Sequence, residues 1–239
     1  MHLEIVTHCF QYHTLLRYQL SSLVVWPPAG MQVTMTVLYT EDDKPTKAVL
    51  DWFGKQSVPG VTWQWIAQPV LELCRRSIGR NLAALRSTAD WVWFCDADYW
   101  FDQQCWQSLG TQGLPADKKL VFPFPILMHR NHAMGDRCIE KARQVEGLVT
   151  ADKADFAPCK IGRAIGGMQI ARGDVCRELG YLRHSRRAQS PQVQPRFFKT
   201  VEDKWFRHKL GTSGTRVRIP GIYRIRHSQA GYETPGVTL

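Results

Sequence analysis

The sequence predicts an α/β protein whose core is a mainly parallel β-sheet flanked by helices. In the first half of the 239-residue chain, short apolar runs alternate with segments of helical periodicity. Turn signals such as Pro27-Pro28 and Pro59-Gly60 separate these segments. Alternation of this kind implies right-handed crossovers between parallel strands. Hydrophobic residues make up 44% of the chain, which is enough for the core of one large domain.

The first half should contain the parallel part of the sheet. Strands are expected at residues 3–7, 33–39, 61–66 and 91–95. Helices are expected at residues 15–24, 48–53 and 75–89. In the last of these helices, Ile78, Leu82 and Leu85 recur on one face, which would pack against the sheet.

The second half is less regular. Strands are expected at 120–124 and 168–171, and two closing strands at 216–219 and 222–226 around Pro220-Gly221. Helices are expected at 175–179 and 202–210. Residues 128–160 carry no pattern that assigns an element. Residues 183–197 are rich in Arg, Gln, Ser and Pro, which favours a mobile loop.

A pair of carboxylates, Asp96-Ala97-Asp98, directly follows the apolar run 91–95. Ligands of open α/β sheets bind at the carboxyl ends of strands. Paired hard oxygen ligands at such a place suit Mg²⁺ or Mn²⁺, and these cations suit phosphates. A solvated turn that uses Asp for its turn chemistry is the alternative.

Three further motifs surround this D-x-D sequence in a fixed order: Gly79-Arg80-Asn81 before it, then Gly166-Gly167, then Glu202-Asp203 at a predicted helix start. With this ordered set, the chain resembles the GT-A nucleotide-sugar glycosyltransferases, most closely the family 2-like group. The resemblance covers most of residues 3–227. It implies a GT-A, Rossmann-like fold with a less regular C-terminal portion on the acceptor side.

The resemblance implies a donor site made from strand ends, the helix before the D-x-D sequence and the Gly-Gly loop. Its expected residues are Thr7, Glu41, Asp42, Asp43, Arg76, Arg80, Asn81, Asp96, Ala97, Gly166 and Gly167. Thr7 would contact the nucleobase, and one of the three acidic residues would bind base or ribose. Arg80 would pair with the diphosphate or the base edge, and an exposed helix charge is the alternative. An acidic turn and a plain glycine turn remain the alternatives for the other motifs.

The resemblance also implies a metal site and a catalytic base. Asp98 would bind Mn²⁺ or Mg²⁺ directly, Asp96 would reach the ribose and the metal shell, and His227 would be a third ligand. Asp203 would accept the proton of the acceptor hydroxyl, with Glu202 orienting sugar or acceptor. Helix N-terminal capping is the alternative for the two acidic residues. A solvated or structural imidazole is the alternative for His227.

The implied activity is metal-dependent, inverting transfer of a sugar, as by a hexosyltransferase, with a UDP-sugar as the default donor. In a single domain spanning 1–239, residues 1–110 would bind the nucleotide-sugar and 111–239 the acceptor. A sugar nucleotidyltransferase is disfavoured, because residues 7–12 lack the Gly-rich phosphate loop that such an enzyme needs after its first strand.

The net charge of +10 is unevenly distributed. Residues 160–226 carry a net charge of +12, and the rest of the chain carries −2. Such asymmetry suggests a polyanionic partner or an anionic membrane surface. The acceptor would then be anionic, such as DNA with a hydroxylated base. A surface polysaccharide or lipid-linked saccharide, a non-catalytic nucleic-acid-binding protein and a merely solvated basic face remain alternatives.

The cysteine pattern points to a reducing compartment. Seven scattered cysteines contain no C-x-x-C, which argues against a disulfide framework or a structural zinc site. We therefore expect a cytoplasmic protein. No run of eighteen apolar residues is present, so no transmembrane segment is expected, while peripheral contact with a membrane stays open.

Overall fold

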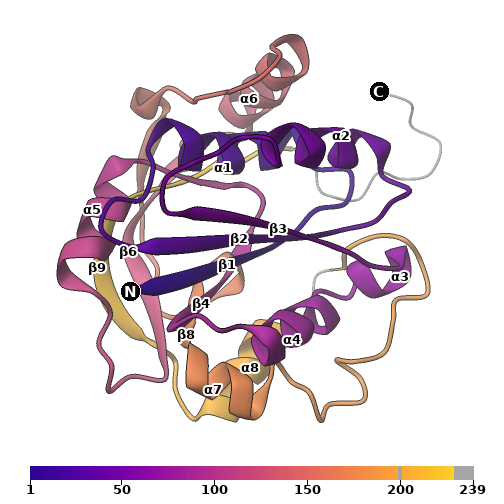
Figure 1. The fold of residues 1–239 in the computed structure, drawn as a ribbon, viewed down its shortest axis with the longest axis vertical. Coiled ribbons are helices and arrows are strands. Elements are labelled where there is room, and N and C mark those ends of the chain that lie inside the picture. The colour runs from indigo at the N-terminus through magenta and orange to yellow at the C-terminus, as the bar shows by residue number, and fades with distance from the viewer. Residues whose placement is uncertain (199–200, 229–239) are drawn as a thin grey trace.

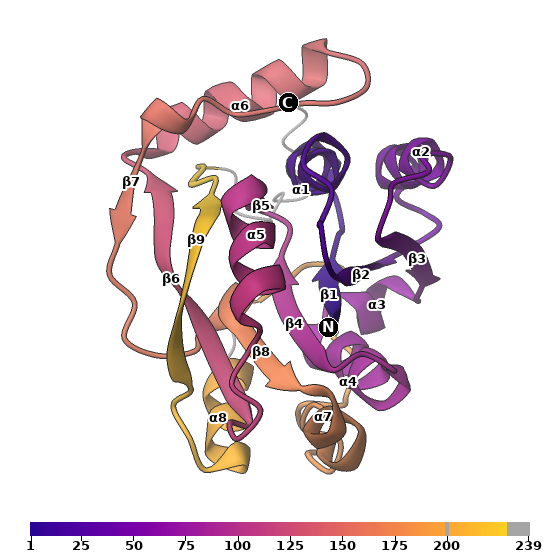
Figure 2. The ribbon, with the colours of Figure 1, turned by 60° about the vertical axis from the view of Figure 1, so that its left-hand side comes forward.

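The computed structural model describes residues 1–198 and 201–228, and within them a curled, nine-stranded sheet lies between helices (Figures 1 and 2). The strands are β1 (His2–His8), β2 (Gln32–Tyr39), β3 (Val61–Ala67), β4 (Trp91–Asp96), β5 (Tyr99–Phe101), β6 (Leu120–His129), β7 (Phe156–Cys159), β8 (Gln169–Arg172) and β9 (Thr215–Arg224). The helices are α1 (His13–Val25), α2 (Lys44–Phe53), α3 (Val70–Leu73), α4 (Arg76–Arg86), α5 (Gln103–Gln112), α6 (His132–Gln144), α7 (Gly173–Leu179) and α8 (Glu202–Leu210), with short 3₁₀ turns η1 (Lys153–Asp155) and η2 (Gly166–Met168).

The sheet joins a parallel part to a mixed part. Its strand order is β3-β2-β1-β4-β8-β6-β9-β5, and β7 pairs with β6. The strands β3, β2, β1 and β4 are parallel, as the alternation of strand and helix predicted. β8 then enters antiparallel between β4 and β6, and β9 runs parallel to β6. The α/β fold class is confirmed, and its parallel character belongs to the first half.

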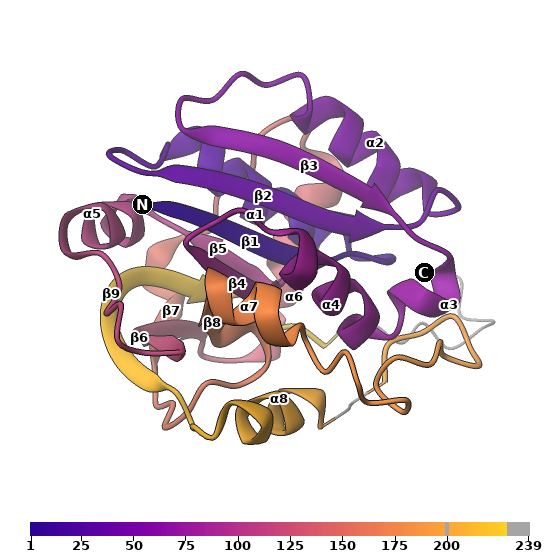
Figure 3. The same ribbon diagram turned by 60° about the horizontal axis from the view of Figure 1, so that its bottom comes forward.

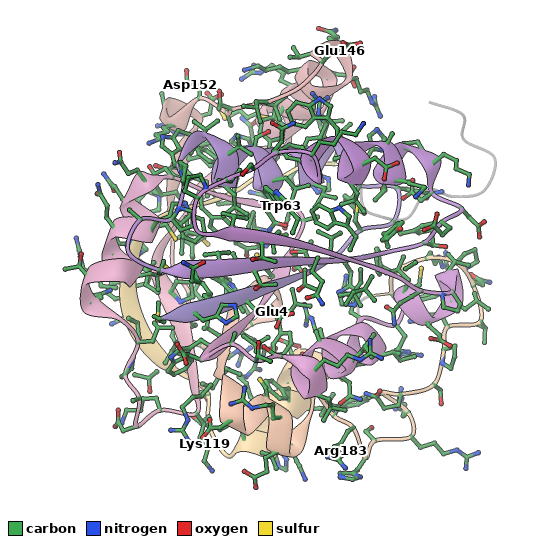
Figure 4. All side chains as sticks on the ribbon, viewed as in Figure 1. Glu4, Trp63, Lys119, Glu146, Asp152 and Arg183 are labelled. Carbon is green, nitrogen blue, oxygen red and sulfur yellow. The ribbon has the colours of Figure 1, made fainter. Side chains whose placement is uncertain are left out.

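Side chains of β1 alternate between two helical layers. Leu3 and Ile5 belong to the core formed with α1 and α2, whereas Val6 packs in the core formed with α4, α7 and α8. Figure 1 shows these layers on opposite sides of the strands. Glu4 lies within the sheet (Figure 4), where it is buried and accepts a hydrogen bond from Thr36 Oγ1 at 2.6 Å. By the same alternation His8, at the carboxyl end of β1, lies on the α4 side.

A third apolar cluster fixes α6 against α1. The hydroxyl of Tyr18 donates to the Cys138 carbonyl at 2.8 Å, and Ile139 and Ala142 are buried beside it. The Arg17 guanidinium donates to three carbonyls at the end of α6, including that of Gly147 at 2.7 Å. These contacts fix the second half of α6, and the start of α6 lies against the residues after β9, because a Cβ at Gly135 would lie 2.0 Å from the Arg226 carbonyl oxygen.

Several predicted boundaries change. The helix expected at 75–89 is α4, over 76–86, and ends where Ser87 adopts an extended conformation. The expectation of two closing strands at 216–219 and 222–226 is wrong. A single strand, β9, continues through Pro220-Gly221, because a register shift opposite Phe124 and Ile126 and the positive φ of Gly221 (77°) absorb the interruption. The unassigned residues 128–160 contain α6, η1 and β7. Residues 183–197 contain neither helix nor strand.

The described helices are short relative to a bilayer. None of those in residues 1–198 and 201–228 is both long and apolar enough to cross a membrane.

Candidate functional site

A cavity of about 370 Å³ opens where β1, β4, β6 and β9 end and where α4 and α6 begin. Five of the residues expected at the site line it: Arg76, Asp96, Ala97, Asp98 and His227. Other lining residues were not singled out from the sequence, and among them are His8, Tyr12, His132, Phe197, Arg224 and Arg226. The cavity therefore lies at the carboxyl edge of the parallel strands, as expected for an open α/β sheet.

The two carboxylates of the D-x-D sequence are held differently. Asp96 ends β4 and has a side chain 31% exposed, whereas Asp98 lies in the following turn with a side chain only 11% exposed. Asp98 Oδ2 accepts from Arg224 Nε at 2.8 Å, while its Oδ1 is buried with no hydrogen-bond partner among the described residues. Burial raises the pKa of Asp98 above its usual value, against the opposing effect of Arg224.

Arg80 lies beneath Asp96. Its side chain is only 3% exposed, and it donates to Asp96 Oδ1 at 3.3 Å and to the hydroxyl of Tyr181 at 3.1 Å. The guanidinium also faces the rings of Phe94 and Tyr181, at 5.9 and 5.4 Å from their centroids. The alternative of an exposed helix charge is therefore wrong. Arg80 holds Asp96 from below and is not among the residues that line the cavity.

The residues on either side of Arg80 have structural contacts of their own. A Cβ at Gly79 would lie 2.2 Å from His8 Nε2, so a glycine is required there for the imidazole to fit. Asn81 Oδ1 accepts from the backbone N–H of Tyr181 at 3.0 Å, which ties α4 to the residues after α7. The Gly-Arg-Asn motif thus packs beneath the cavity, where it positions His8 and Asp96 and holds the backbone at Tyr181.

The Gly-Gly loop lies directly against the D-x-D sequence. A Cβ on Gly167 would lie 2.8 Å from the backbone nitrogen of Asp96, and one on Gly166 would lie 3.6 Å from Asp96 Oδ2. The indole N–H of Trp93 donates to the Gly167 carbonyl at 3.0 Å. The backbone N–H of Gly166 donates to Asp203 Oδ2 at 3.4 Å. The loop therefore connects Asp96 to the start of α8.

The two acidic residues of α8 differ in their surroundings. Asp203 is 25% exposed and pairs with Arg207 Nη1 at 3.1 Å. Glu202 is almost fully buried, with Oε1 3.6 Å from Arg75 Nη1, an ion pair that joins α8 to the turn before α4. Neither residue is among those lining the cavity, but Asp203 reaches the loop that borders it.

The acidic group after β2 lies away from the cavity lining. Asp43 caps α2, accepting from Thr46 at both its N–H and its hydroxyl, and also accepts from the Gln11 N–H at 2.6 Å. Glu41 accepts from the hydroxyl of Tyr39 and pairs with Lys47 at 3.3 Å, and Asp42 is exposed.

Thr7 is fully buried, and its hydroxyl has no hydrogen-bond partner within residues 1–198 and 201–228. The donor-binding roles expected for Thr7 and for the acidic group after β2 remain proposals.

His8 is the principal residue that the sequence analysis missed. It pairs with Asp96 in the register of β1 and β4, is only 6% exposed and lines the cavity. Neither ring nitrogen has a hydrogen-bond partner in the described part of the chain. Burial, together with the charges of Arg80 and Arg76, lowers the pKa of His8 well below its usual value, so the imidazole is neutral at pH 7. Extending the predicted first strand by one residue would have identified it.

The donor atoms at the cavity partly fit a divalent cation. Within the described ranges, no three or more His, Cys, Asp or Glu side chains converge as a ready-made metal site. Asp98 Oδ1 is nevertheless a buried hard oxygen without a partner. Mg²⁺-type sites commonly use one or two carboxylates and complete the shell with water and substrate phosphate. Asp96 and Asp98 therefore suit such a cation, and a ligand role for His227 remains a proposal.

Comparison with known proteins supports the fold assignment. No family model and no curated protein sequence matches the chain. The structure of S. aureus TarS 1–349 in complex with UDP-GlcNAc matches 100% of this chain and 62% of its own, with a TM-score of 0.55 and 10% identity. The mannosyltransferase PcManGT from Pyrobaculum calidifontis, in complex with GDP-Man and Mn²⁺, matches 95% and 58%, with a TM-score of 0.54 and 10% identity. The chain spans about three fifths of these structures and has the GT-A fold that its motifs implied.

The contacts of Asp43 predict a stability difference between adjacent aspartates. Asp43→Ala should lower the free energy of unfolding by about 2 kcal/mol, because α2 loses its N-cap and the Gln11 N–H loses its acceptor. Asp42→Ala, at the exposed neighbouring position, should change it by less than about 0.5 kcal/mol. Urea denaturation of both variants measures the difference, and equal effects would show that the cap contributes nothing.

Proposed function

We propose that this chain is a metal-dependent glycosyltransferase that moves a sugar from a nucleotide-sugar to an acceptor hydroxyl with inversion. The main support is the line of contacts from the D-x-D sequence through the Gly-Gly loop to Asp203, which gathers distant motifs on one side of the sheet. Two structures with this fold contain UDP-GlcNAc in one case, and GDP-Man with Mn²⁺ in the other. We take a UDP-sugar as the default donor.

The donor would occupy the cavity at the ends of β1 and β4, and residues 1–110 would supply most of its contacts. Asp98 and Asp96 would hold the divalent cation, which when bound offsets the charge that grows on the departing diphosphate. Arg76, at the start of α4, lines the same cavity and carries a fork of donors suited to phosphate oxygens. The absence of Cβ atoms at Gly166 and Gly167 lets the loop pack against Asp96, and from there its backbone would approach the donor sugar.

Asp203 is the proposed general base. Both hydrogen bonds that its carboxylate accepts from the described residues, from Gly166 and Arg207, go to Oδ2, and we propose that Oδ1 takes the proton of the acceptor hydroxyl. The acceptor oxygen then bonds to the anomeric carbon as the bond to the diphosphate breaks on the opposite face. Glu202 is proposed to orient sugar or acceptor, although its pairing with Arg75 also gives it a structural role.

The acceptor is proposed to be anionic and to lie along residues 111–239, with DNA carrying a hydroxylated base as the leading candidate. No acidic residue occurs between residues 180 and 201, and Arg183, Arg186 and Arg187 are exposed there. Arg183 projects at the periphery (Figure 4). This segment runs from α7 towards α3 (Figure 3), where the Gln192 N–H donates to the Leu71 carbonyl at 2.9 Å.

The same basic segment also supports a second candidate, a nucleic-acid-binding protein without transferase activity. Arg187 lies 5.5 Å from the ring centroid of Trp205, and Arg76 lies 5.2 Å from that of Phe197. Arginines with adjacent aromatic rings suit the phosphates and bases of single strands. Detection of sugar transfer by the wild-type chain would exclude this second candidate.

Thermal unfolding with nucleotide diphosphates tests the donor site. UDP with Mn²⁺, at one hundred times its dissociation constant, should raise the melting temperature by roughly 5–10 °C, because it binds only the folded chain. Asp98→Asn should lose the Mn²⁺-dependent part of this shift. Asp174→Asn, an exposed aspartate paired with Arg172, should retain it. A shift with GDP alone would reassign the donor, and no shift with any nucleotide and metal would contradict the proposal.

Kinetics of two neighbouring variants test the general base. Asp203→Asn should lower kcat by roughly 10²–10⁴-fold, because the amide cannot accept the proton, while UDP and Mn²⁺ binding stays within about twofold. Glu202→Gln should lower kcat less. If Glu202→Gln were the more damaging change, or if Asp203→Asn kept full activity, Asp203 would not be the base.

Salt-dependent binding tests the anionic acceptor. Affinity for a single-stranded oligonucleotide should fall steeply between 50 and 200 mM salt, as expected when phosphate contacts release counterions. Replacing Arg183, Arg186 and Arg187 together by Gln should flatten the slope of log K against log salt by about two, since each phosphate contact contributes about 0.7 on a single strand. The same change at the exposed residues Lys44, Lys55 and Arg86 should leave it nearly unaltered. Affinity that is flat with salt would overturn the idea.

A further inference from the structure

Each carboxylate of the D-x-D sequence already has an arginine of its own. Arg80 Nη2 lies 3.3 Å from Asp96 Oδ1, and Arg224 Nε lies 2.8 Å from Asp98 Oδ2. Two guanidinium charges therefore balance two carboxylate charges before any ligand enters. A divalent cation that bound here without further change would meet a neutral group of side chains.

The two arginines differ in their freedom to move. Arg80 is 3% exposed, is bonded to the hydroxyl of Tyr181 and faces two aromatic rings, so it cannot leave without abandoning a buried charge. Arg224 is 41% exposed, lies at the end of β9 and lines the cavity. Its described contacts with the site are one hydrogen bond through Nε and the ring of Tyr99, 5.6 Å away.

At Asp98, a bound divalent cation and the Arg224 guanidinium would compete for the same carboxylate. Its side chain is only 11% exposed, and Oδ1 is buried without a hydrogen-bond partner in the described residues. A cation on Oδ1 and the guanidinium on Oδ2 would then contact the same carboxylate. The surroundings of this carboxylate are largely buried and screen charge poorly. Two positive charges at that separation repel strongly, whereas a partly exposed arginine can rotate away.

We propose that Arg224 is an exchangeable counter-ion of Asp98, displaced when a divalent cation binds, whereas Arg80 stays on Asp96. The released guanidinium remains in the cavity, where its planar donors suit the diphosphate of the donor. Metal and nucleotide then favour each other's binding, because the nucleotide gives Arg224 a new anionic partner. This inference rests on the donor and metal site of the proposed function.

A role for Arg224 in orienting Asp98 predicts the opposite change in metal affinity. If Arg224 instead served to orient Asp98 for the metal, its removal would weaken metal binding, as is typical for residues that hydrogen-bond a ligating carboxylate. The sign of the change in Mn²⁺ affinity therefore separates displacement from orientation.

Titration of the full chain with Mn²⁺ alone, with unbound Mn²⁺ followed by electron paramagnetic resonance, measures this sign. Arg224→Met should bind Mn²⁺ about tenfold more tightly than the wild type, because the competing cation is gone. Arg226→Met removes the same charge from an exposed residue of the same cavity that has no ion pair with either aspartate among the described contacts. It should change the affinity by less than about twofold. Adding UDP should raise Mn²⁺ affinity more in the wild type than in Arg224→Met.

A second variant guards against a folding defect. Arg224→Gln keeps a hydrogen-bond donor for Asp98 without the charge, and it should also bind Mn²⁺ more tightly. The inference would be overturned if both Arg224 variants bound Mn²⁺ more weakly than the wild type, or if their affinity changed no more than that of Arg226→Met. It would also be overturned if no form of the chain bound Mn²⁺. Tighter Mn²⁺ binding by the Arg224 variants without any UDP effect on melting would support the exchange and contradict the donor assignment alone.

Discussion

A buried guanidinium is the contact on which this site depends. Arg80 lies beside the rings of Phe94 and Tyr181, which contact each other, and it reaches Asp96 at the end of β4. Burying such a charge is costly unless it is paired and hydrogen-bonded, and Asp96 and the Tyr181 hydroxyl supply partners for its two Nη atoms, while Nε has no hydrogen-bond partner among the described residues. Removal of the Asp96 carboxylate would leave an uncompensated charge in the core, and removal of the Tyr181 hydroxyl would leave a buried donor without its acceptor. The contact between Arg80 and Asp96 therefore fixes both the position of α4 against the sheet and the orientation of the Asp96 side chain.

The mixed half of the sheet brings the remaining motifs to the edge where the parallel strands end. The parallel strands bring His8 and Asp96 to one edge, but they cannot bring residues 166 and 203 there. Because β8 pairs antiparallel with β4, the chain just before β8 passes the carboxyl end of β4, and Gly167 meets the backbone of Asp96. The reversed strand thus explains how motifs far apart in sequence share one site.

The sequence patterns predicted the parts of the structure that depend on local periodicity. Four short apolar runs and their helices yielded the parallel half, and the order of motifs placed the Gly-Gly loop near the D-x-D sequence. What was missed depends on distant partners. The helix α6 is polar in composition and is fixed by Arg17 and Tyr18 of α1, and Arg224 meets Asp98 across 126 positions. No window of neighbouring residues contains such information.

The balance of charge in the cavity bears on the diphosphate that the proposed function places there. Arg76, Arg224 and Arg226 line it together with two aspartates, so the arginines exceed the carboxylates. His8 adds no charge, because burial and the neighbouring arginines keep its ring neutral. A dication placed among these groups alone would be poorly matched, whereas a dication that arrives with a diphosphate brings compensating negative charge. In the proposed function, this arrangement of charges would suit a divalent cation bound together with a nucleotide diphosphate better than the cation alone.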